Sequence, residues 1–279
     1  MNFQHALLSF FTLFILSSCG SANVNEAITD AHYAHPVERY GHFALGKPHE
    51  YASLVATTRS GRKLTLQLPH DEVFEDKAPR LVRLAENEAV AILAIVSHRN
   101  SGARLVLIRP HGKGLAISAQ SPAIGTPNRW LNPVGVADLD GDGHAEIAAV
   151  ITPHIGGTLK AYREQGKALI EIASLWGFSN HHYGSAELGL STTVTLSGRQ
   201  YLLVPDTTRL QLRLITLENE QLVEAGRCAL STPITGAIRS SAPHEVSIVT
   251  QAGQQMIALD SCMNERRILA PATRHLHKQ

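Results

Sequence analysis

Hydrophobic and polar residues alternate along much of this chain in short stretches that end at turns. Residues 209–214 alternate strictly between polar residues and leucine, whereas residues 89–96 form an unbroken apolar run. Strict alternation is typical of a strand with one buried face, and a short apolar run bounded by turns is typical of a strand buried on both faces. The pattern therefore predicts an all-β chain.

The predicted strands recur in units, and successive units start about 39 to 55 residues apart. Four short strands per unit at this period are typical of propeller blades, which cover one another's faces by radial stacking. The length suits a β-propeller of about five four-stranded blades, and a two-sheet β-sandwich is the alternative. The predicted strands are 42–45, 51–57, 63–68 and one near 73; 81–85, 89–96, 103–109 and 115–119; 134–138, 146–151, 158–163 and 168–175; 192–196, 200–204, 209–217 and 222–230; and 235–239, 245–250, 255–259 and 267–270.

One segment carries a candidate metal site. The nine residues from Asp138 to Glu146 read D-L-D-G-D-G-H-A-E. Four carboxylates, and a backbone carbonyl just after a sharp glycine turn, are oxygen ligands of the kind that Ca²⁺ prefers. The expected ligands of one structural calcium ion are Asp138, Asp140, Asp142, His144 through its carbonyl, and Glu146. A polar turn that binds no ion is the alternative.

The flanks of this segment indicate strands and not helices. Pro133 and Gly135 precede it, an apolar run at 147–151 follows it, and Ala149 stands where an EF-hand needs a bidentate glutamate. The loop therefore joins two strands. When the sequence is aligned with itself at an offset of 55 residues, Asp138 falls on Arg83. The preceding unit is therefore expected to contain an equivalent loop without metal ligands.

The acidic segment resembles the FG-GAP/VCBS-type repeats of β-propellers, in which a D-x-D-G-D-G-x-x-[DE] loop precedes an apolar strand. Residues 78–81, 125–131 and 178–184 add a similarity to bacterial FG-GAP-repeat proteins of undefined function. The resemblance covers residues 38–190 well and the last third of the chain poorly. It implies a propeller and a metal loop, and it implies no enzymatic activity.

The start of the chain resembles an export signal. Residues 6–16 are apolar except for Ser9 and Thr12, a length that suits a signal peptide and is too short for a permanent membrane anchor. The run ends in L-S-S-C, which resembles a bacterial lipobox, although no basic residue precedes it. An ordinary cleaved signal is the alternative. The expected organisation is a signal peptide at 1–18, lipidated Cys19 and a linker at 19–37, the propeller at 38–273 and a tail at 274–279.

Gly20 follows the cysteine, which by analogy with lipoprotein sorting favours the outer membrane, facing the periplasm. Apart from Cys19, the chain has two cysteines, Cys228 and Cys262. In an oxidising compartment, such a pair can form a disulfide bond. A disulfide between them is expected, and two buried thiols are the alternative. The lipid anchor is the expected link to the membrane.

Charge and composition argue against a nucleic-acid partner. Lysine and arginine number 25 against 24 acidic residues, which gives a net charge of +1, and aromatic residues make up 5% of the chain. Neither a basic field nor a set of stacking side chains is therefore expected. No nucleophilic serine motif or glycine-rich phosphate loop is present, and the acidic residues cluster only in the candidate calcium loop.

Four residues are candidate ligand contacts. His181 and His182 are adjacent in a segment that joins two units, where propellers commonly place binding loops; most of the 15 histidines are interpreted as surface or loop residues. Arg129 and Trp130 precede the unit with the acidic loop, and Trp130 is either a wedge between blades or a binding platform. The expected function is non-enzymatic binding of an envelope protein or a glycan. A polysaccharide-active enzyme is the alternative, and the oligomeric state stays open.

Overall fold

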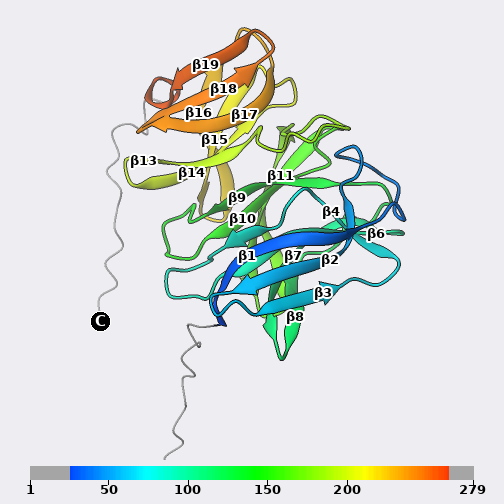
Figure 1. Ribbon diagram of the computed structural model, residues 1–279. Coiled ribbons are helices and arrows are strands. Elements are labelled where there is room, and N and C mark those ends of the chain that lie inside the picture. Colours follow the sequence, from blue (N-terminus) through cyan, green and yellow to red (C-terminus); the bar gives the residue numbers. More distant parts are fainter. Residues whose placement is uncertain (1–25, 264–279) are drawn as a thin grey trace, which may run out of the picture.

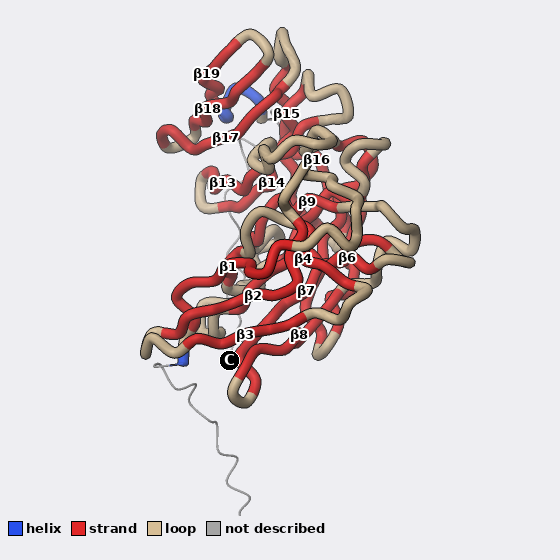
Figure 2. Tube along the Cα trace, turned by 45° about the vertical axis from the view of Figure 1, so that its right-hand side comes forward, coloured by secondary structure: helices blue, strands red, loops and turns tan. Residues whose placement is uncertain are grey.

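The computed structural model describes residues 26–263, and this part of the chain is built from strands. Residues 26–263 contain no α-helix, and a short 3₁₀ helix, η2 (Leu259–Cys262), follows the last strand. Strands dominate the trace in Figure 2. The strands are β1 (Ile28–Pro36), β2 (Glu50–Thr58), β3 (Lys63–Gln67), β4 (Glu72–Glu75), β5 (Arg80–Val82), β6 (Ala91–His98), β7 (Gly102–His111), β8 (Gly114–Gln120), β9 (Leu131–Ala137), β10 (Glu146–Ile151), β11 (Gly157–Gln165), β12 (Ala168–Phe178), β13 (Thr192–Leu196), β14 (Arg199–Pro205), β15 (Gln211–Glu218), β16 (Gln221–Ala229), β17 (Ile234–Ala242), β18 (Glu245–Thr250) and β19 (Gly253–Ala258).

These strands form antiparallel units in chain order. Strands β5–β8, β9–β12 and β13–β16 each make a four-stranded meander, and β17–β19 make a three-stranded one. The first unit is irregular, because β2 pairs with β1, β3 and β4, and β4 also pairs with β6. A single parallel pair, Ala168 with Gln120, links β12 to β8. The prediction of an all-β chain is therefore confirmed.

Consecutive sheets pack face to face, because alternate residues of their central strands enter two different cores. In β6, Leu93 and Ile95 face the core shared with the third unit, whereas Ile92 and Ala94 face the core shared with the first. In β10, Ile147 and Ala149 face the core shared with the second unit, whereas Ala148 and Val150 face the core shared with the fourth. The unbroken apolar runs thus bury both faces, as their composition predicts.

The stack of sheets does not close into a barrel or propeller. In residues 26–263, no strand of the first unit pairs with β17, β18 or β19. Figure 1 shows β17–β19 at one end of the molecule and β1–β3 toward the other. The hydrogen bonds of β4 to both β2 and β6 merge the first two units into one sheet, where a propeller would keep its blades separate. This open all-β arrangement is compatible with the β-sandwich alternative.

Two predictions about the N-terminal third are wrong. The linker expected at residues 19–37 contains β1, which pairs with β2 along its length, so the fold begins before residue 38. Residues 42–45, expected to be a strand, form turns, because this segment is held by a buried carboxylate described below. The signal peptide, Cys19, the strand expected at 267–270 and the tail lie outside the described residues.

A disulfide bond joins the 3₁₀ helix after the last strand to β16. Cys228 on β16 and Cys262 in η2 are bonded, which is the pairing that the sequence predicts. Both cysteines contact the apolar core between the fourth and fifth units (β13–β16 and β17–β19), together with Leu212 and Leu259. Residues 26–263 contain no helix that is long and apolar enough to cross a membrane.

Candidate functional site

The acidic segment forms a tight loop between β9 and β10. The Asp138 carboxylate accepts hydrogen bonds from the backbone N–H groups of Gly141, Asp142 and Gly143, at 2.7, 3.1 and 3.0 Å. Gly141 and Gly143 have φ angles of +82° and +91°, a backbone conformation that glycine adopts at little cost. The D-x-D-G-D-G pattern therefore encodes the turn itself: one aspartate satisfies the amides and two glycines permit the bend.

Glu146 at the end of the loop is fully buried. One of its oxygens, Oε2, accepts a hydrogen bond of 3.0 Å from the Leu139 N–H. Leu139 is itself buried in the core between the third and fourth units (β9–β12 and β13–β16), and its carbonyl accepts a hydrogen bond from Thr216 on β15. Burial raises the pKa of Glu146 above its ordinary value, while the bonds from Leu139 and Arg163 oppose that rise. The loop is thus anchored between two sheets by a buried acid.

An arginine that the sequence did not reveal lies among the acids. Arg163 on β11 donates to Glu146 Oε1 at 2.7 Å and to Asp140 Oδ2 at 2.5 Å, and its Nη2 lies 3.6 Å from Asp142 Oδ2. Burial alone would lower the pKa of Arg163, but the hydrogen bonds to Glu146 and Asp140 outweigh it and raise that pKa. The positive guanidinium offsets the negative charges of these three carboxylates, which would otherwise repel one another.

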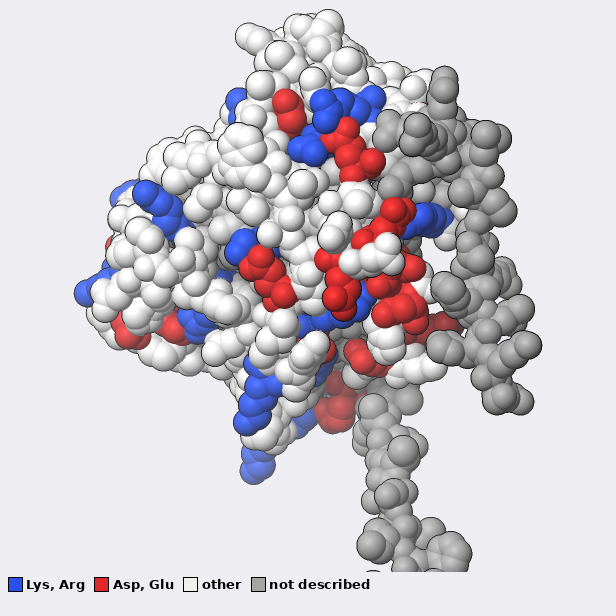
Figure 3. Space-filling model, turned by 180° about the vertical axis from the view of Figure 1, so that it is seen from behind, with Lys and Arg blue, Asp and Glu red and all other residues white. Residues whose placement is uncertain are grey.

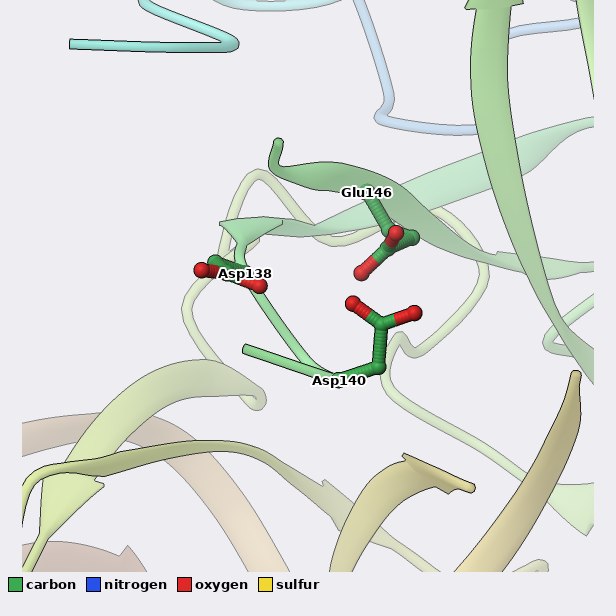
Figure 4. Close-up of side chains that lie close together, drawn as sticks. All are labelled: Asp138, Asp140 and Glu146. Carbon is green, nitrogen blue, oxygen red and sulfur yellow. The ribbon is translucent and has the colours of Figure 1, made fainter. Parts of the chain in front are cut away.

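The carboxylates nevertheless have the chemistry and spacing of a divalent-cation site. Asp138, Asp140 and Glu146 each offer an oxygen, and these oxygens lie within 4.8 Å of one another. Figure 4 shows the carboxylates of Asp140 and Glu146 facing each other, with Asp138 to one side. Calcium takes 6–8 oxygen ligands. The donor set fits such an ion in kind, and Arg163 competes with it for the oxygens of Asp140 and Glu146.

The two remaining expected ligands lie at the exposed rim of the loop. Asp142 accepts a hydrogen bond from the His144 N–H, and His144 forms an isolated β-bridge with Ala85 of the preceding unit. A pocket of about 550 Å³ adjoins them and also contacts Arg163 and the Arg109–Glu164 ion pair. Figure 3 shows acidic side chains gathered in one area of the surface, with basic side chains beside them.

In the equivalent loop of the preceding unit, the cation is an arginine side chain of the protein itself. Arg83 donates through Nη1 to the backbone carbonyls of Glu86 and Glu88. A guanidinium therefore occupies this loop, as the alignment of Arg83 with Asp138 suggests.

A second polar site lies where five connecting segments meet. Two adjoining pockets, of about 380 and 350 Å³, share His154 and Tyr183 in their walls. We call the combined feature the histidine groove. Its histidine, arginine and aromatic lining residues are His42, Arg129, Trp130, His154, His181, His182, Tyr183 and Arg209.

The central histidines of the groove form a directed chain of hydrogen bonds. His181 Nε2 lies 2.8 Å from the Ser185 carbonyl, which only accepts, so Nε2 carries the proton and Nδ1 accepts. His154 Nε2 then donates to His181 Nδ1 at 2.6 Å. Burial lowers the pKa of His154 to about 3 and that of His181 to about 4, with nearby histidines contributing. Both rings are therefore neutral at neutral pH.

Two buried glutamates position the His42 side of the groove. Glu50 accepts hydrogen bonds from the N–H groups of Tyr40, Gly41 and His42, and burial raises its pKa. Glu75, its neighbour across β2 and β4, places Oε1 2.9 Å from His42 Nδ1. These contacts explain why residues 42–45 turn where the pattern predicts a strand.

The four residues predicted from sequence as ligand contacts meet at this groove. His181 and Trp130 have ring centroids 4.8 Å apart, and His182 and Arg129 line opposite pockets. Trp130 is only 1% exposed and donates from Nε1 to the Glu75 carbonyl, so most of its ring packs in the core. Arg129 donates to the carbonyl of its neighbour Asn128.

Several groove and loop residues were missed by sequence reasoning. Arg163 had a usable signal, because a hairpin of strands 146–151 and 158–163 places Glu146 opposite it, and the observed pair Ile147–Tyr162 has that register. His42, His154 and Arg209 had no such signal. They come from loops of three different units, and only the packing of those units brings the loops together.

The protonation of His181 gives a pH-dependent stability. Between pH 6.5 and about 4, His181 is protonated in the unfolded chain but not in the folded chain. The free energy of unfolding therefore falls as the pH falls through this range. We expect His181 to account for a loss of about 2 kcal/mol between pH 7.5 and 5, at about 1.4 kcal/mol per pH unit. Urea unfolding at several pH values measures this.

The His181→Asn variant should have a flatter stability profile across that range. His32→Asn, on the exposed edge strand β1, should retain the wild-type slope. Equal slopes for His181→Asn and the wild type would contradict the assignment.

No known family model matches the chain, and no curated protein is significantly similar to it. The FG-GAP/VCBS resemblance therefore stays a prediction that depends on the acidic loop and its flanks.

Proposed function

We propose that this protein is a non-enzymatic binding protein of the bacterial envelope whose ligand, a glycan or another envelope protein, docks in the histidine groove. The observation that carries this proposal is the groove itself, with neutral histidines, exposed Tyr183 and two arginines on its walls. Such a mixture of aromatic and hydrogen-bonding side chains suits recognition of a polar ligand.

An open stack of antiparallel meanders, compatible with a β-sandwich, is the proposed architecture in which the groove forms. Three four-stranded meanders in chain order, with a core between each pair of consecutive sheets, support it. The near-equal numbers of acidic and basic residues argue against a nucleic-acid partner.

The proposed location is the outer membrane facing the periplasm, with Cys19 as the lipid-bearing residue. The apolar run at 6–16 and the L-S-S-C sequence support export and lipidation. The disulfide between Cys228 and Cys262 is consistent with an oxidising compartment.

Calcium is proposed as a structural cofactor of the acidic loop, held by Asp138, Asp140, Asp142, Glu146 and the carbonyl of His144. Asp140→Ala together with Asp142→Ala should lower the melting temperature in calcium by several degrees and abolish its response to EDTA, because a divalent ion replaces repulsion with coordination. Thermal unfolding with and without EDTA measures both effects. An unchanged melting curve would count against the site.

Affinity capture of the full chain from envelopes tests the binding role. We expect a partner or glycan to be retained by the wild type and lost from His154→Ala, which alters the centre of the groove. Asp260→Ala, remote from the groove at the end of the last sheet, is the matched control. Equal recovery from all three proteins would contradict the proposed groove.

A polysaccharide-active enzyme is the second candidate, because Glu75 and His42 form a carboxylate–imidazole pair at the groove. Glu75 Oε1 lies 2.9 Å from His42 Nδ1 without hydrogen-bond geometry, so the pair supplies a carboxylate and an imidazole side by side, two groups that acid–base chemistry uses. Release of reducing ends from envelope polysaccharide by the wild type, and its loss in His42→Gln, would favour this candidate over simple binding.

A further inference from the structure

We infer that the end of the histidine groove beside Arg209 binds the oxyanion of an acidic saccharide. This inference extends the proposed binding function by naming the chemistry of the ligand. The subsite is the pocket of about 380 Å³ formed by the loop between β10 and β11, the segment after β12 and the turn between β14 and β15. None of the residues that line it is acidic.

Arg209 is a cation without a carboxylate partner in this pocket. Among the described residues its guanidinium forms no ion pair within 4.0 Å, although the charge of Asp206 acts on it from farther away, and its buried Nε has no hydrogen-bond partner. Its one side-chain bond is from Nη1 to Ser179 Oγ at 3.1 Å. The nearest acid in sequence, Asp206, is occupied by Thr208 and the Gln211 N–H. The forked donors of Arg209 therefore remain available to a carboxylate, sulfate or phosphate.

His182 supplies a second polar atom to the same pocket. Its Nε2 is buried and has no hydrogen-bond partner, while a hydrogen bond to the Ile234 backbone holds the ring. Burial, together with Arg209, lowers the pKa of His182, and burial also lowers the pKa of Arg209. The charge of Asp206 opposes the lowered pKa of Arg209 but does not cancel it. A bound oxyanion would add negative charge beside Arg209 and would favour a proton on His182 Nε2.

Aromatic side chains beside the pocket indicate that the anion belongs to a saccharide. Tyr183 lines the pocket and is 63% exposed, with its hydroxyl fixed to the His42 carbonyl at 2.8 Å. Trp176 on β12 is 70% exposed, and its indole borders Gly156 of the pocket wall. Exposed aromatic rings that flank a polar pocket can stack on sugar rings.

Titration calorimetry of the full chain tests the inference with glucuronate, glucose, sulfate and phosphate as separate probes. We expect glucuronate to bind at least tenfold more tightly than glucose, with sulfate or phosphate competing for the site. Arg209→Gln should weaken glucuronate binding at least tenfold. Trp176→Ala should weaken glucuronate binding while leaving sulfate binding within twofold.

Arg239→Gln, an exposed arginine on β17, is the matched control and should bind as the wild type does. Arg209→Lys retains the charge without the fork and should bind with intermediate affinity, which keeps the test informative if Arg209→Gln fails to fold. Failure of wild-type protein to distinguish glucuronate from glucose would overturn the inference. Binding of sulfate alone, unaffected by Trp176→Ala, would overturn its saccharide part. The capture experiment is independent, since a protein partner could be retained with no glucuronate binding.

Discussion

Replacing Arg163 with methionine is expected to lower the free energy of unfolding by about 2 to 4 kcal/mol in EDTA. The fully buried Glu146 would lose its cationic partner, and Asp140 and Asp142 would regain their mutual repulsion. The range is smaller than for a wholly buried pair, because the Arg163 side chain is 23% exposed. Urea unfolding in EDTA measures the loss.

Calcium should restore much of that stability, because a divalent ion can take the position near the carboxylates that the guanidinium leaves. Stabilisation by a ligand at a hundred times its dissociation constant is about 2.7 kcal/mol. We therefore expect Arg163→Met to bind calcium more tightly than the wild type and to gain more stability from it. Both quantities follow from calorimetry and from unfolding curves in calcium.

Arg199→Met provides the control for this experiment. Arg199 also pairs with a glutamate, Glu218, but both side chains are more than a third exposed, so its loss should change stability by less than about 1 kcal/mol. Arg163→Met with wild-type stability in EDTA, or with no response to calcium, would contradict the role assigned to the acidic loop.

Removing the disulfide is expected to have an effect of comparable size. The Cys228→Ala, Cys262→Ala double variant should lose about 3 to 4 kcal/mol, since the bond closes a loop across a sequence separation of 34 residues and restricts the unfolded chain. The loss should be greatest around β16–β19, where the bonded residues contact the last core. Hydrogen exchange locates the loss and urea unfolding measures it.

A reducing agent should destabilise the wild type to a similar extent and leave the double variant unchanged. If reduction has the same effect on both proteins, the stabilisation does not come from this bond.

Local pattern was a good guide to strands. Residues 192–196 and 245–250 were predicted with the bounds observed for β13 and β18, because apolar alternation and glycine turns act over a few residues. The same local rules failed for β1, whose composition is polar because one face is largely exposed at the sheet edge. They also failed at residues 42–45, where Glu50 and Glu75 impose a turn from outside the segment.

The sequence by itself determined the all-β class, the turn of the acidic loop and the choice of Cys228 and Cys262 as partners. Each depends on neighbouring residues or on a count of residue types. Only the tertiary structure decided that the sheets form an open stack, because the backbone bonds of β4 to β2 and β6 depend on no particular side chains. It also decided that Arg163 lies among the acids and that Arg209 and His182 share a pocket, since residues far apart in sequence meet only once the sheets have packed.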